Sequence, residues 1–444
     1  MGNPSVLIGC GSAYANDRLG PAFDLARSAR VRYLGFDCLA ERTLALAQLR
    51  KLQNPQAGQD ERIDDLVPLV AEFTAAGGRI VGNFGAANPR AAVDQFAAGL
   101  RAVGRTGVRI AMIEGDDVLN QVRQEDLELP ELQTTVGSLG DRLVSAHAYI
   151  GAEPIVEALE ADADLVVGGR LADPSLFVGP ICHELGWALD DWELLGQATL
   201  VGHLLECGVH STGGNFEDPP YRTVPDPHNL AFPFAAVDAT GATVTKLPGT
   251  GGAVNLATTR TQLYYEIHDP RRYLTPDVTA DFLNVRIEET GPDMVHVSGA
   301  QGSRRPDTLK VLVGVDMGWK GVGEASFAGP GCLDRARRAD EIIRRRLESW
   351  SEEFDDLRID LQGWNSLFGD QYRPADEPAE VRLRLAVRSR NLAAVRAAVY
   401  EAEYLYFGPA GGGGVVTSVT PMIAVTPAYL PRERVSTNVE VTVS

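Results

Sequence analysis

Polar and charged residues follow each of five short apolar segments in the first 175 residues of the chain. They are Gly9, Gly11, Ser12, Asp17 and Arg18 after the first segment, Asp37 and Glu41 after the second, Asn83 and Asn88 after the third, Asp116 and Asp117 after the fourth, and Arg170 and Asp173 after the fifth. Carboxylates, amides and an arginine at one edge of a domain suit acid/base catalysis and the anchoring of an anion. For Asp17, Asp116 and Asp173, capping of the next helix is the alternative role.

The loop after the first segment, Gly9-Cys-Gly11-Ser12, could accept a phosphate or carboxylate on backbone N–H groups at the start of a helix. A dinucleotide-binding loop would have a third glycine where this chain has Tyr14, although Asp37 stands where a ribose-binding acid would. We therefore favour a polar active-site loop, in which Gly9, Gly11, Ser12 and Arg18 bind substrate, over a nicotinamide site.

A second group of chemically active side chains shares one face of a predicted helix. His203, Cys207 and His210 are spaced by four and then three residues, and Glu206 precedes His210 by four. This spacing suits a metal site or an acid/base cluster. The alternative is a packed helix end in which the cysteine belongs to the core and a histidine caps the helix. The following Thr212-Gly213-Gly214 segment offers free N–H groups to a ligand and favours the functional interpretation.

Two glycine-rich loops further along the chain are candidate anion-binding loops. The first places Lys246, one of only four lysines, just before Gly249-Thr250-Gly251. It is not a Walker phosphate-binding motif, because the lysine precedes the glycines and no helix-opening Lys-Ser/Thr follows. The second contains Gly411-Gly412-Gly413, and such a run costs backbone entropy that a ligand would justify. A flexible turn is an equally good interpretation of either loop.

These side chains need a scaffold that brings strand ends together, and the hydrophobic pattern predicts one. Short buried strands are expected at Ser5–Ile8, Val31–Phe36, Arg79–Asn83, Val108–Ile113 and Leu165–Val167. Between them, amphipathic patterns predict helices at about 17–29, 40–53, 62–77, 89–104 and 153–162. The alternation predicts a parallel α/β domain over residues 1–210 that ends in a long helix at 184–207. The glycine loop favours an open, doubly wound sheet over a closed barrel, although these strands alone do not decide between them.

The remainder of the chain has a different composition. Residues 211–305 combine Pro- and Gly-rich loops with short alternating strands from Thr212 to about Gly302, which predicts a loop-rich insertion or lid. Residues 306–444 predict an α+β domain, with strands at 309–315, 322–328, 355–361, 380–388, 415–425 and 438–443 and helices at 332–350 and 391–404. Pairing through this layer would make the chain a homo-oligomer.

Composition excludes several classes of protein. The chain has 41 Lys and Arg against 60 Asp and Glu, and its formal charge of −19 repels nucleic acid and anionic membranes. Five scattered cysteines predict neither a disulfide framework nor a thiolate zinc site, which suits a reducing cytoplasm. The sequence predicts neither a membrane span nor a secretory leader. Because Arg far outnumbers Lys and Ala and Gly are abundant, we expect a bacterial protein. On so acidic a surface, a small anionic ligand must be held by a local patch of Arg, Lys or backbone N–H groups.

Several longer motifs recur together in one known family. They are Asp37-Cys-Leu-Ala-Glu41-Arg42, Asn83-x-Gly-Ala-Ala-Asn88-Pro89, Glu114-Gly-Asp-Asp117, Gly169-Arg170-x-Ala-Asp173-Pro, His203-Leu-Leu-Glu206-Cys207-Gly with Thr212-Gly-Gly214, Lys246-x-Pro-Gly-Thr-Gly-Gly252 and the glycine run that follows Gly408. Jointly they resemble the acyclic terpene utilisation A family over residues from about 5 to 415. The resemblance implies a pathway for acyclic terpenoids that is built on branched acyl-CoA esters, without implying a particular reaction. Some members carry a further small ferredoxin-like domain or work beside a separate protein of that type, so such a partner is expected for a chain that ends at Ser444.

Two functional hypotheses follow. The first is an enzyme acting on a small carboxylate or acyl thioester, a lyase of the hydratase/dehydratase type, since such chemistry needs an acid, a base and anchors for an oxygen. Its catalytic candidates are Asp37, Glu41, His203, Glu206 and Cys207, its further binding candidates are Asn83, Asn88, Arg170, Lys246 and the glycine loops, and its candidates for a divalent metal such as Mg²⁺ are Asp116, Asp117 and Asp173. The second hypothesis is a non-catalytic nucleotide- or CoA-binding subunit of a multi-protein enzyme.

Overall fold

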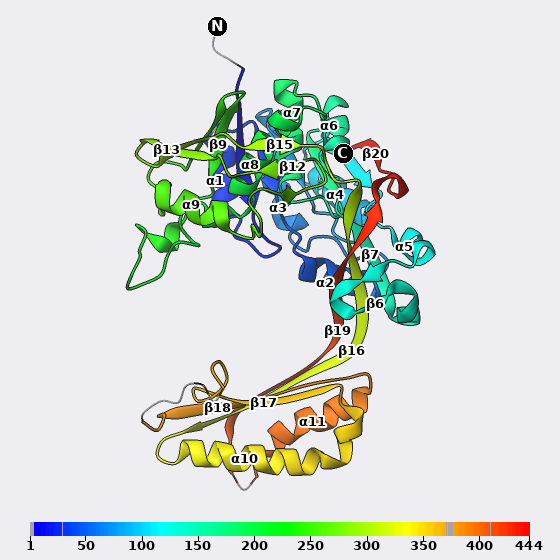
Figure 1. Ribbon diagram of the computed structural model, residues 1–444, viewed down its shortest axis with the longest axis vertical. Helices are drawn as coiled ribbons and strands as arrows, with labels where there is room; N and C mark the ends of the chain where they lie inside the picture. The colour runs from blue at the N-terminus through cyan, green and yellow to red at the C-terminus, as the bar shows by residue number, and fades with distance from the viewer. Residues whose placement is uncertain (1–3, 29, 370, 372–375, 409) are drawn as a thin grey trace. The chain divides into compact units, whose positions relative to one another are not determined.

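The computed structural model describes residues 4–28, 30–369, 371, 376–408 and 410–444 of the chain. The chain divides into two units (Figure 1). Unit 1 comprises Met1–Gly140, Val144–Gly314 and Val425–Ser444, and unit 2 comprises Asp141–Leu143 and Val315–Ala424. Among the described residues, no helix is both long and apolar enough to cross a lipid bilayer.

Unit 1 is built on an open ten-stranded sheet. Five strands run parallel in the order β1 (Val6–Ser12), β2 (Tyr33–Phe36), β3 (Arg79–Gly82), β8 (Leu165–Gly168) and β4 (Arg109–Glu114). Antiparallel strands extend the sheet, with β9 (Phe234–Asp238), β10 (Gly241–Thr245), β14 (Met294–Ser298) and β13 (Arg286–Gly291) beyond β1 and β20 (Asn438–Val443) beside β4. The sheet is mixed rather than parallel throughout, because β9, from the segment that the sequence predicts to be loop-rich, pairs antiparallel with β1, and β20 pairs antiparallel with β4.

Two groups of helices pack against this sheet. One contains α1 (Gly20–Arg27), α3 (Ile63–Ala75) and α4 (Pro89–Ala102), and the other contains α6 (Glu153–Glu160), α7 (Ser175–Leu185) and α8 (Trp192–Glu206). The single helix predicted at 184–207 is two helices, because Gly186 adopts a left-handed conformation that ends α7 and Asp191 caps α8. The other elements of this unit are α2 (Glu41–Gln53), α5 (Leu119–Glu125), α9 (Leu256–Tyr264), β5 (Glu128–Leu129), β6 (Thr134–Thr135), β7 (Leu143–Ala148), β11 (Tyr273–Leu274), β12 (Thr279–Asp281) and β15 (Gln301–Ser303).

The parallel strands of unit 1 are buried in an apolar core, and polar side chains lie at their carboxyl ends. The rings of Phe36, Phe84 and Phe96 pack in sequence, with centroids 5.2 and 5.4 Å apart. All four residues of β2 and all four of β8 are buried, as expected for strands covered by helices. Asp37 and Arg170 follow these two strands within two residues. The fold therefore gathers at one sheet edge the polar residues that the sequence singles out.

Unit 2 contains the elements β16 (Thr308–Ala328), α10 (Cys332–Leu347), β17 (Asp356–Gln362), β18 (Glu380–Ser389), α11 (Leu392–Tyr404) and β19 (Gly413–Pro431) in chain order. Its strands lie in the order β17-β18-β16-β19, and this βαββαβ arrangement is the ferredoxin-like topology. Both helices pack on one face of the sheet (Figure 1). The strands predicted at 309–315 and 322–328 are one strand, β16, whose first residues belong to unit 1.

Candidate active site

Asp37 follows β2 directly and is held by the amide of Asn83, which follows β3. Asn83 Nδ2 donates to Asp37 Oδ1 at 2.8 Å, and Asn83 Oδ1 accepts from the Cys38 N–H at 2.6 Å. The second bond fixes the amide, since only its nitrogen can donate to the carboxyl. Burial raises the pKa of Asp37 to about 7, the charge of Asp173 adds to the rise, and the charge of Arg170 opposes it. Asp37 therefore gains and loses its proton near neutral pH.

Glu206 and His203 lie in the last turn of α8, with 5% and 1% of their surfaces exposed. His203 Nδ1 is 3.0 Å from Glu206 Oε1, and His203 Nε2 is 3.0 Å from the carbonyl oxygen of Gln262. Glu206 Oε2 has no hydrogen-bond partner among the described residues. Burial raises the pKa of Glu206 well above its usual value, and the charges of Asp173 and Asp37 raise it further. Burial also lowers the pKa of His203 to about 4, so the imidazole is neutral at pH 7.

Arg170 places a positive charge beside these carboxyls and is only 1% exposed. Its guanidinium donates to the carbonyl oxygens of Leu39 and Leu171 and to the carboxylate of Asp173. It also lies over the ring of Tyr149, 4.5 Å from the centroid. Because these protein groups engage the guanidinium, Arg170 acts on the site through its charge rather than as an open anchor for an anion.

Glu41, Tyr149 and Lys310 form the solvent-facing rim of this cluster. Glu41 Oε1 accepts from Lys310 Nζ at 2.8 Å and from the Tyr149 hydroxyl at 3.1 Å. The side chains of Lys310 and Glu41 are 41% and 42% exposed. Although burial acts to raise the pKa of Glu41, the hydrogen bond and charge of Lys310 outweigh it and hold that pKa below its usual value. Glu41 is thus an ionised, cation-paired carboxylate, unlike Asp37.

Asp116 and His147 form a second buried carboxylate–imidazole pair. Asp116 Oδ2 accepts from His147 Nδ1 and from the Arg170 N–H, both at 2.9 Å. Burial acts to raise the pKa of Asp116, but the hydrogen bond and charge of His147 hold it below its usual value. His147 Nε2 is buried without a hydrogen-bond partner in the described part of the chain.

The three carboxylates expected to hold a divalent metal have other partners. Asp116 is bonded to His147, Asp117 Oδ1 accepts from the Leu119 N–H at 3.2 Å, and Asp173 pairs with Arg170. Within the described ranges, no group of three or more His, Cys, Asp and Glu side chains is placed to hold a metal ion. Helix capping, the alternative role predicted for Asp116 and Asp173, is not seen: α5 begins after Val118 and α7 after Pro174, and neither helix has a side-chain cap from a described residue.

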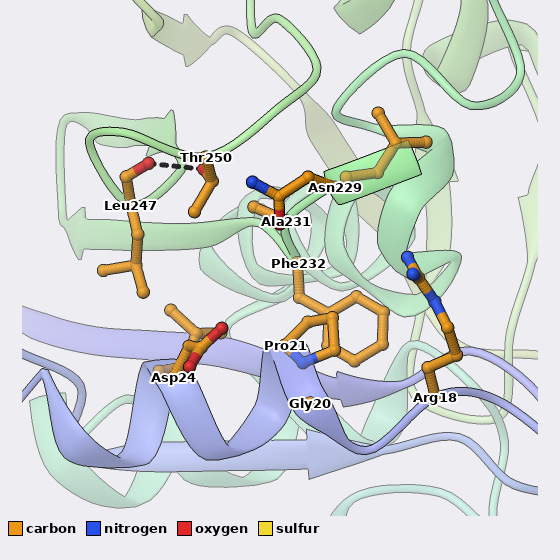
Figure 2. A pocket seen from close by; sticks show the side chains of 11 residues that line it. Arg18, Gly20, Pro21, Asp24, Asn229, Ala231, Phe232, Leu247 and Thr250 are labelled. Carbon is orange, nitrogen blue, oxygen red and sulfur yellow. Dashed lines mark hydrogen bonds between the residues drawn. The ribbon is translucent and has the colours of Figure 1, made fainter. Parts of the chain in front are cut away.

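A pocket of about 160 Å³ opens beside the first residues of α1 (Figure 2). Arg18 and Thr250, both predicted to bind substrate, line it together with Asn229 and Leu247. Arg18 lies at one end, where its guanidinium donates to the carbonyl oxygen of His228 at 3.3 Å, and Leu247 and Thr250 lie toward the other end (Figure 2). The volume is below the roughly 300–1,000 Å³ of a drug-sized ligand site, so the pocket suits one small group of a larger molecule.

Several glycines that the sequence assigns to substrate binding have packing roles. A Cβ at Gly11 would overlap the ring of Phe36, and a Cβ at Gly251 would overlap the carbonyl oxygen of Asp226. Gly213 has a φ of 108°, which side-chain-bearing residues rarely adopt. The others are Gly9 within β1, Gly214 against Val209, and Gly249, which turns with a φ of 80°. These glycines shape the backbone whether or not a ligand is present.

Four other predicted residues bond to the protein itself. Asn88 Oδ1 caps α4, Thr212 Oγ1 donates to a carbonyl oxygen at 2.8 Å, and Ser12 Oγ does so at 2.9 Å. Lys246 Nζ donates to the Thr250 carbonyl oxygen at 2.9 Å and pairs with Asp293 at 3.1 Å. Each of these groups holds a loop in place.

Two further predictions, for Cys207 and for the glycine run at 411–413, have different outcomes. Burial raises the pKa of the Cys207 thiol, and the charge of Glu206 raises it further, so the thiol is not an activated nucleophile. Gly411, Gly412 and Gly413 belong to unit 2, whereas the other predicted residues belong to unit 1.

Tyr149, His147, Lys310 and Gln262 complete the arrangement and are absent from the sequence-based prediction. Of these four residues, only Lys310 could have been noticed in the sequence, because the chain has just four lysines. His147 and Tyr149 lie in and just after β7, a strand that the pattern does not predict. Gln262 acts through its backbone carbonyl oxygen, which no residue type reveals.

Comparison with known proteins identifies the family, whereas the two solved structures that match have TM-scores below 0.2. The de novo designed protein Ferredog-Diesel is 18% identical over 23% of this chain and 85% of its own, with a TM-score of 0.17. A homoserine dehydrogenase from Thiobacillus denitrificans is 11% identical over 91% of this chain and 84% of its own, with a TM-score of 0.15. Neither likeness carries an argument about fold or function.

No curated protein matches the chain. The sequence model of the acyclic terpene utilisation family protein AtuA matches residues 6–441. This match covers nearly the whole chain and every predicted site residue, and it confirms the resemblance drawn from the motifs. The chain belongs to the acyclic terpene utilisation AtuA family.

Proposed function

We propose that the chain is an enzyme that acts on a small carboxylate or acyl thioester of acyclic terpene utilisation, as a lyase of the hydratase/dehydratase type. The observation that carries the proposal is the pair of proton-binding carboxyls, Asp37 and Glu206, on two elements of one unit. The charge of Asp37 is among those that raise the pKa of Glu206, so the two groups interact. Perturbed carboxyls of this kind concentrate where proton transfer is catalysed.

Addition or loss of water across a carbon–carbon bond needs one group that takes a proton from carbon and another that protonates the departing hydroxyl. A carboxyl with a pKa near 7, as Asp37 has, can fill either role at neutral pH. Burial raises the pKa of Glu206 well above its usual value and so favours its protonated form, which makes it the second proton-transfer group. Glu41 is kept ionised by Lys310 and belongs to the rim of the site rather than to the proton transfer.

The anionic part of the substrate is assigned to the Arg18 pocket. The exposed guanidinium of Arg18 donates one long bond, to His228, and a guanidinium has five N–H donors. The pocket also contains the Thr250 hydroxyl, which donates to the Leu247 carbonyl oxygen at 2.6 Å and keeps its lone pairs for an acceptor role. If Arg18 binds a remote anionic group, Arg18→Ala raises KM and leaves kcat nearly unchanged.

The test is turnover of a defined panel by the purified chain. Branched 2-enoyl-CoA and 3-hydroxyacyl-CoA thioesters, and the corresponding free acids, are incubated with protein, and mass spectrometry detects gain or loss of one water. Asp37→Asn and Glu206→Gln should each lower kcat by about 100-fold or more. Asp94→Asn and Glu157→Gln, which change exposed helix carboxyls, are matched controls that retain turnover.

Two results would refute the proposal. One is full turnover in both Asp37→Asn and Glu206→Gln. The other is binding of CoA or thioesters, detected as thermal stabilisation, with no water gained or lost by any member of the panel. That second result would instead identify a non-catalytic binding subunit.

A further inference from the structure

His203 has a different partner at each ring nitrogen, and one partner fixes its tautomer. Nε2 faces the backbone carbonyl oxygen of Gln262 at 3.0 Å, and a carbonyl oxygen can only accept a hydrogen bond. Nε2 therefore carries a hydrogen. The Gln262 side chain returns a bond from its Nε2 to the His203 carbonyl oxygen at 3.0 Å, which ties α8 to α9 and holds this geometry. In the neutral ring, Nδ1 is then a bare lone pair.

Glu206 must supply the hydrogen in the bond to Nδ1 if the ring is neutral. The Nδ1 to Oε1 distance is 3.0 Å, and both side chains are buried. The other possibility is an imidazolium–carboxylate ion pair, in which Oε2 would bear negative charge. Oε2 has no donor among the described residues, and an unsatisfied buried carboxylate oxygen is costly. A carboxylic acid leaves a weaker acceptor there, so the neutral pair is favoured.

The charges around the pair act in the same direction. The ionisable groups that face Glu206 are Asp37 after β2, Arg170 and Asp173 after β8, Cys207 beside it, Glu266 after α9 and Tyr273 in β11. Negative groups outnumber the single arginine, so a carboxylate at Glu206 is disfavoured. Tyr273 and Phe282 pack against the His203 ring with centroids 5.6 and 6.2 Å away, and they exclude water from it.

We infer that His203 and Glu206 form a proton relay, in which Glu206 is protonated at rest and bonds through Oε1–H to His203 Nδ1. When a ligand gives a proton to Glu206 Oε2, the Oε1–H bond breaks and an Nδ1–H bond forms. One proton leaves the ligand carbon, one arrives on the imidazole, and Glu206 stays neutral throughout. The ligand gains the negative charge and His203 the positive charge, and the reverse transfer restores both.

The relay rests on the proposed function and assigns roles within it. Glu206 Oε2 is the atom that exchanges a proton with the ligand carbon, and Asp37 is left to exchange one with the ligand hydroxyl. His203 is a positioning residue, because it acts through Glu206 and does not touch the ligand. A carboxylic acid can then act as a base without first becoming a buried carboxylate.

The resting state is testable on the ligand-free protein and independently of any activity. Nitrogen NMR of ¹⁵N-histidine-labelled wild-type chain should show one imidazole that stays in the Nε2–H form down to about pH 4. The infrared spectrum at pH 7 should contain two protonated carboxylic C=O bands, one that Asp37→Asn removes and one that Glu206→Gln removes. Asp116→Asn, which alters the other buried carboxylate–imidazole pair, is the matched control and keeps these signals. An imidazolium with both nitrogens protonated, together with no carboxyl band that Glu206→Gln removes, would overturn the inference even if the chain proves to be an enzyme.

The transfer step is tested by exchange of deuterium from water into the carbon adjacent to the thioester carbonyl of a branched acyl-CoA probe. Wild-type exchange should be nearly independent of pH between 5 and 7, and His203→Asn should lower it by about 100-fold at pH 6. Exchange in His203→Asn should recover with rising pH, because Glu206 then works only after losing its proton. A pH-independent loss would indicate a structural role for His203 and overturn the relay. Absence of exchange in wild type overturns the proposed function and the relay together, while the spectra still decide the resting state.

Discussion

Replacement of Asp37 by asparagine should make the stability of unit 1 less dependent on pH. Burial and the charge of Asp173 raise the pKa of Asp37 from 3.8 to about 7 in the folded protein. The stabilisation that this group provides is therefore complete below pH 3.8 and is lost as pH rises to about 7. A rise of about three in pKa corresponds to about 4 kcal/mol, of which about 2 kcal/mol falls between pH 5 and 7. The amide of Asp37→Asn does not titrate and lacks this loss.

The comparison uses the free energy of unfolding at pH 5, 6 and 7. Urea-dependent hydrogen exchange, read by mass spectrometry on peptides from β1, β2 and β3, follows unit 1 by itself. The difference between Asp37→Asn and wild type should shift in favour of the variant by about 2 kcal/mol over this range. Asp94→Asn, an exposed carboxyl on α4, should show a constant difference. A constant difference in Asp37→Asn as well would mean that Asp37 is already ionised at pH 5, and the acid/base assignment would fall with it.

Three further predictions use the same contacts. The free energy of unfolding of Glu206→Gln should rise relative to that of wild type as pH increases above 4.5. Burial raises the pKa of Glu206 in the folded protein, so the wild type loses stability over that pH range. The same hydrogen-exchange measurement detects the difference. Asp173→Asn removes a charge that raises the pKa of Asp37, so an infrared titration should place that pKa below about 7. Gly11→Ala should destabilise unit 1 by about 1–3 kcal/mol in urea unfolding, because its Cβ would overlap the ring of Phe36.

The part of the fold that follows from local pattern could be predicted from the sequence. Predicted strands at Arg79–Asn83 and Leu165–Val167 correspond to β3 and β8, and the predicted helix at 89–104 to α4, because burial and helix caps leave local signatures. Pairing between distant segments leaves no such signature. Residues 211–305 look loop-rich, yet β9 pairs with β1 and continues the sheet, since backbone ladders depend on neighbours rather than on composition.

The sequence could predict those site residues that directly follow parallel strands, but not the residues that other segments contribute. Asp37 and Arg170 could be placed together because parallel strands end at one edge of a sheet. The sequence did not decide whether Lys246 and the glycine loop at 249–251 bind a ligand or support a loop. The partner of Lys246 in its ion pair, Asp293, lies in a hairpin whose short strands could be expected but whose pairing could not. Tyr149 was missed for the same reason, because its neighbour along the chain, β7, depends on pairing with β16.

Under the proposed function, an acidic chain binds an anionic ligand, and the charge balance of the cluster is compatible with this. Of the carboxyls in the cluster, Asp173 is paired with Arg170 and Glu41 with Lys310, so each pair is neutral overall. Asp37 is held by an amide and Glu206 by a neutral imidazole, and these are the two that bind protons. With both protons in place the four carboxyls and two cations sum to zero, whereas the whole chain carries −19. Loss of the Asp37 proton above about pH 7 adds a negative charge, so the affinity for an anionic ligand should fall there while its proton-accepting capacity rises. Under the proposed function, the pKa of Asp37 therefore sets a compromise between binding an anionic ligand and exchanging a proton with its hydroxyl.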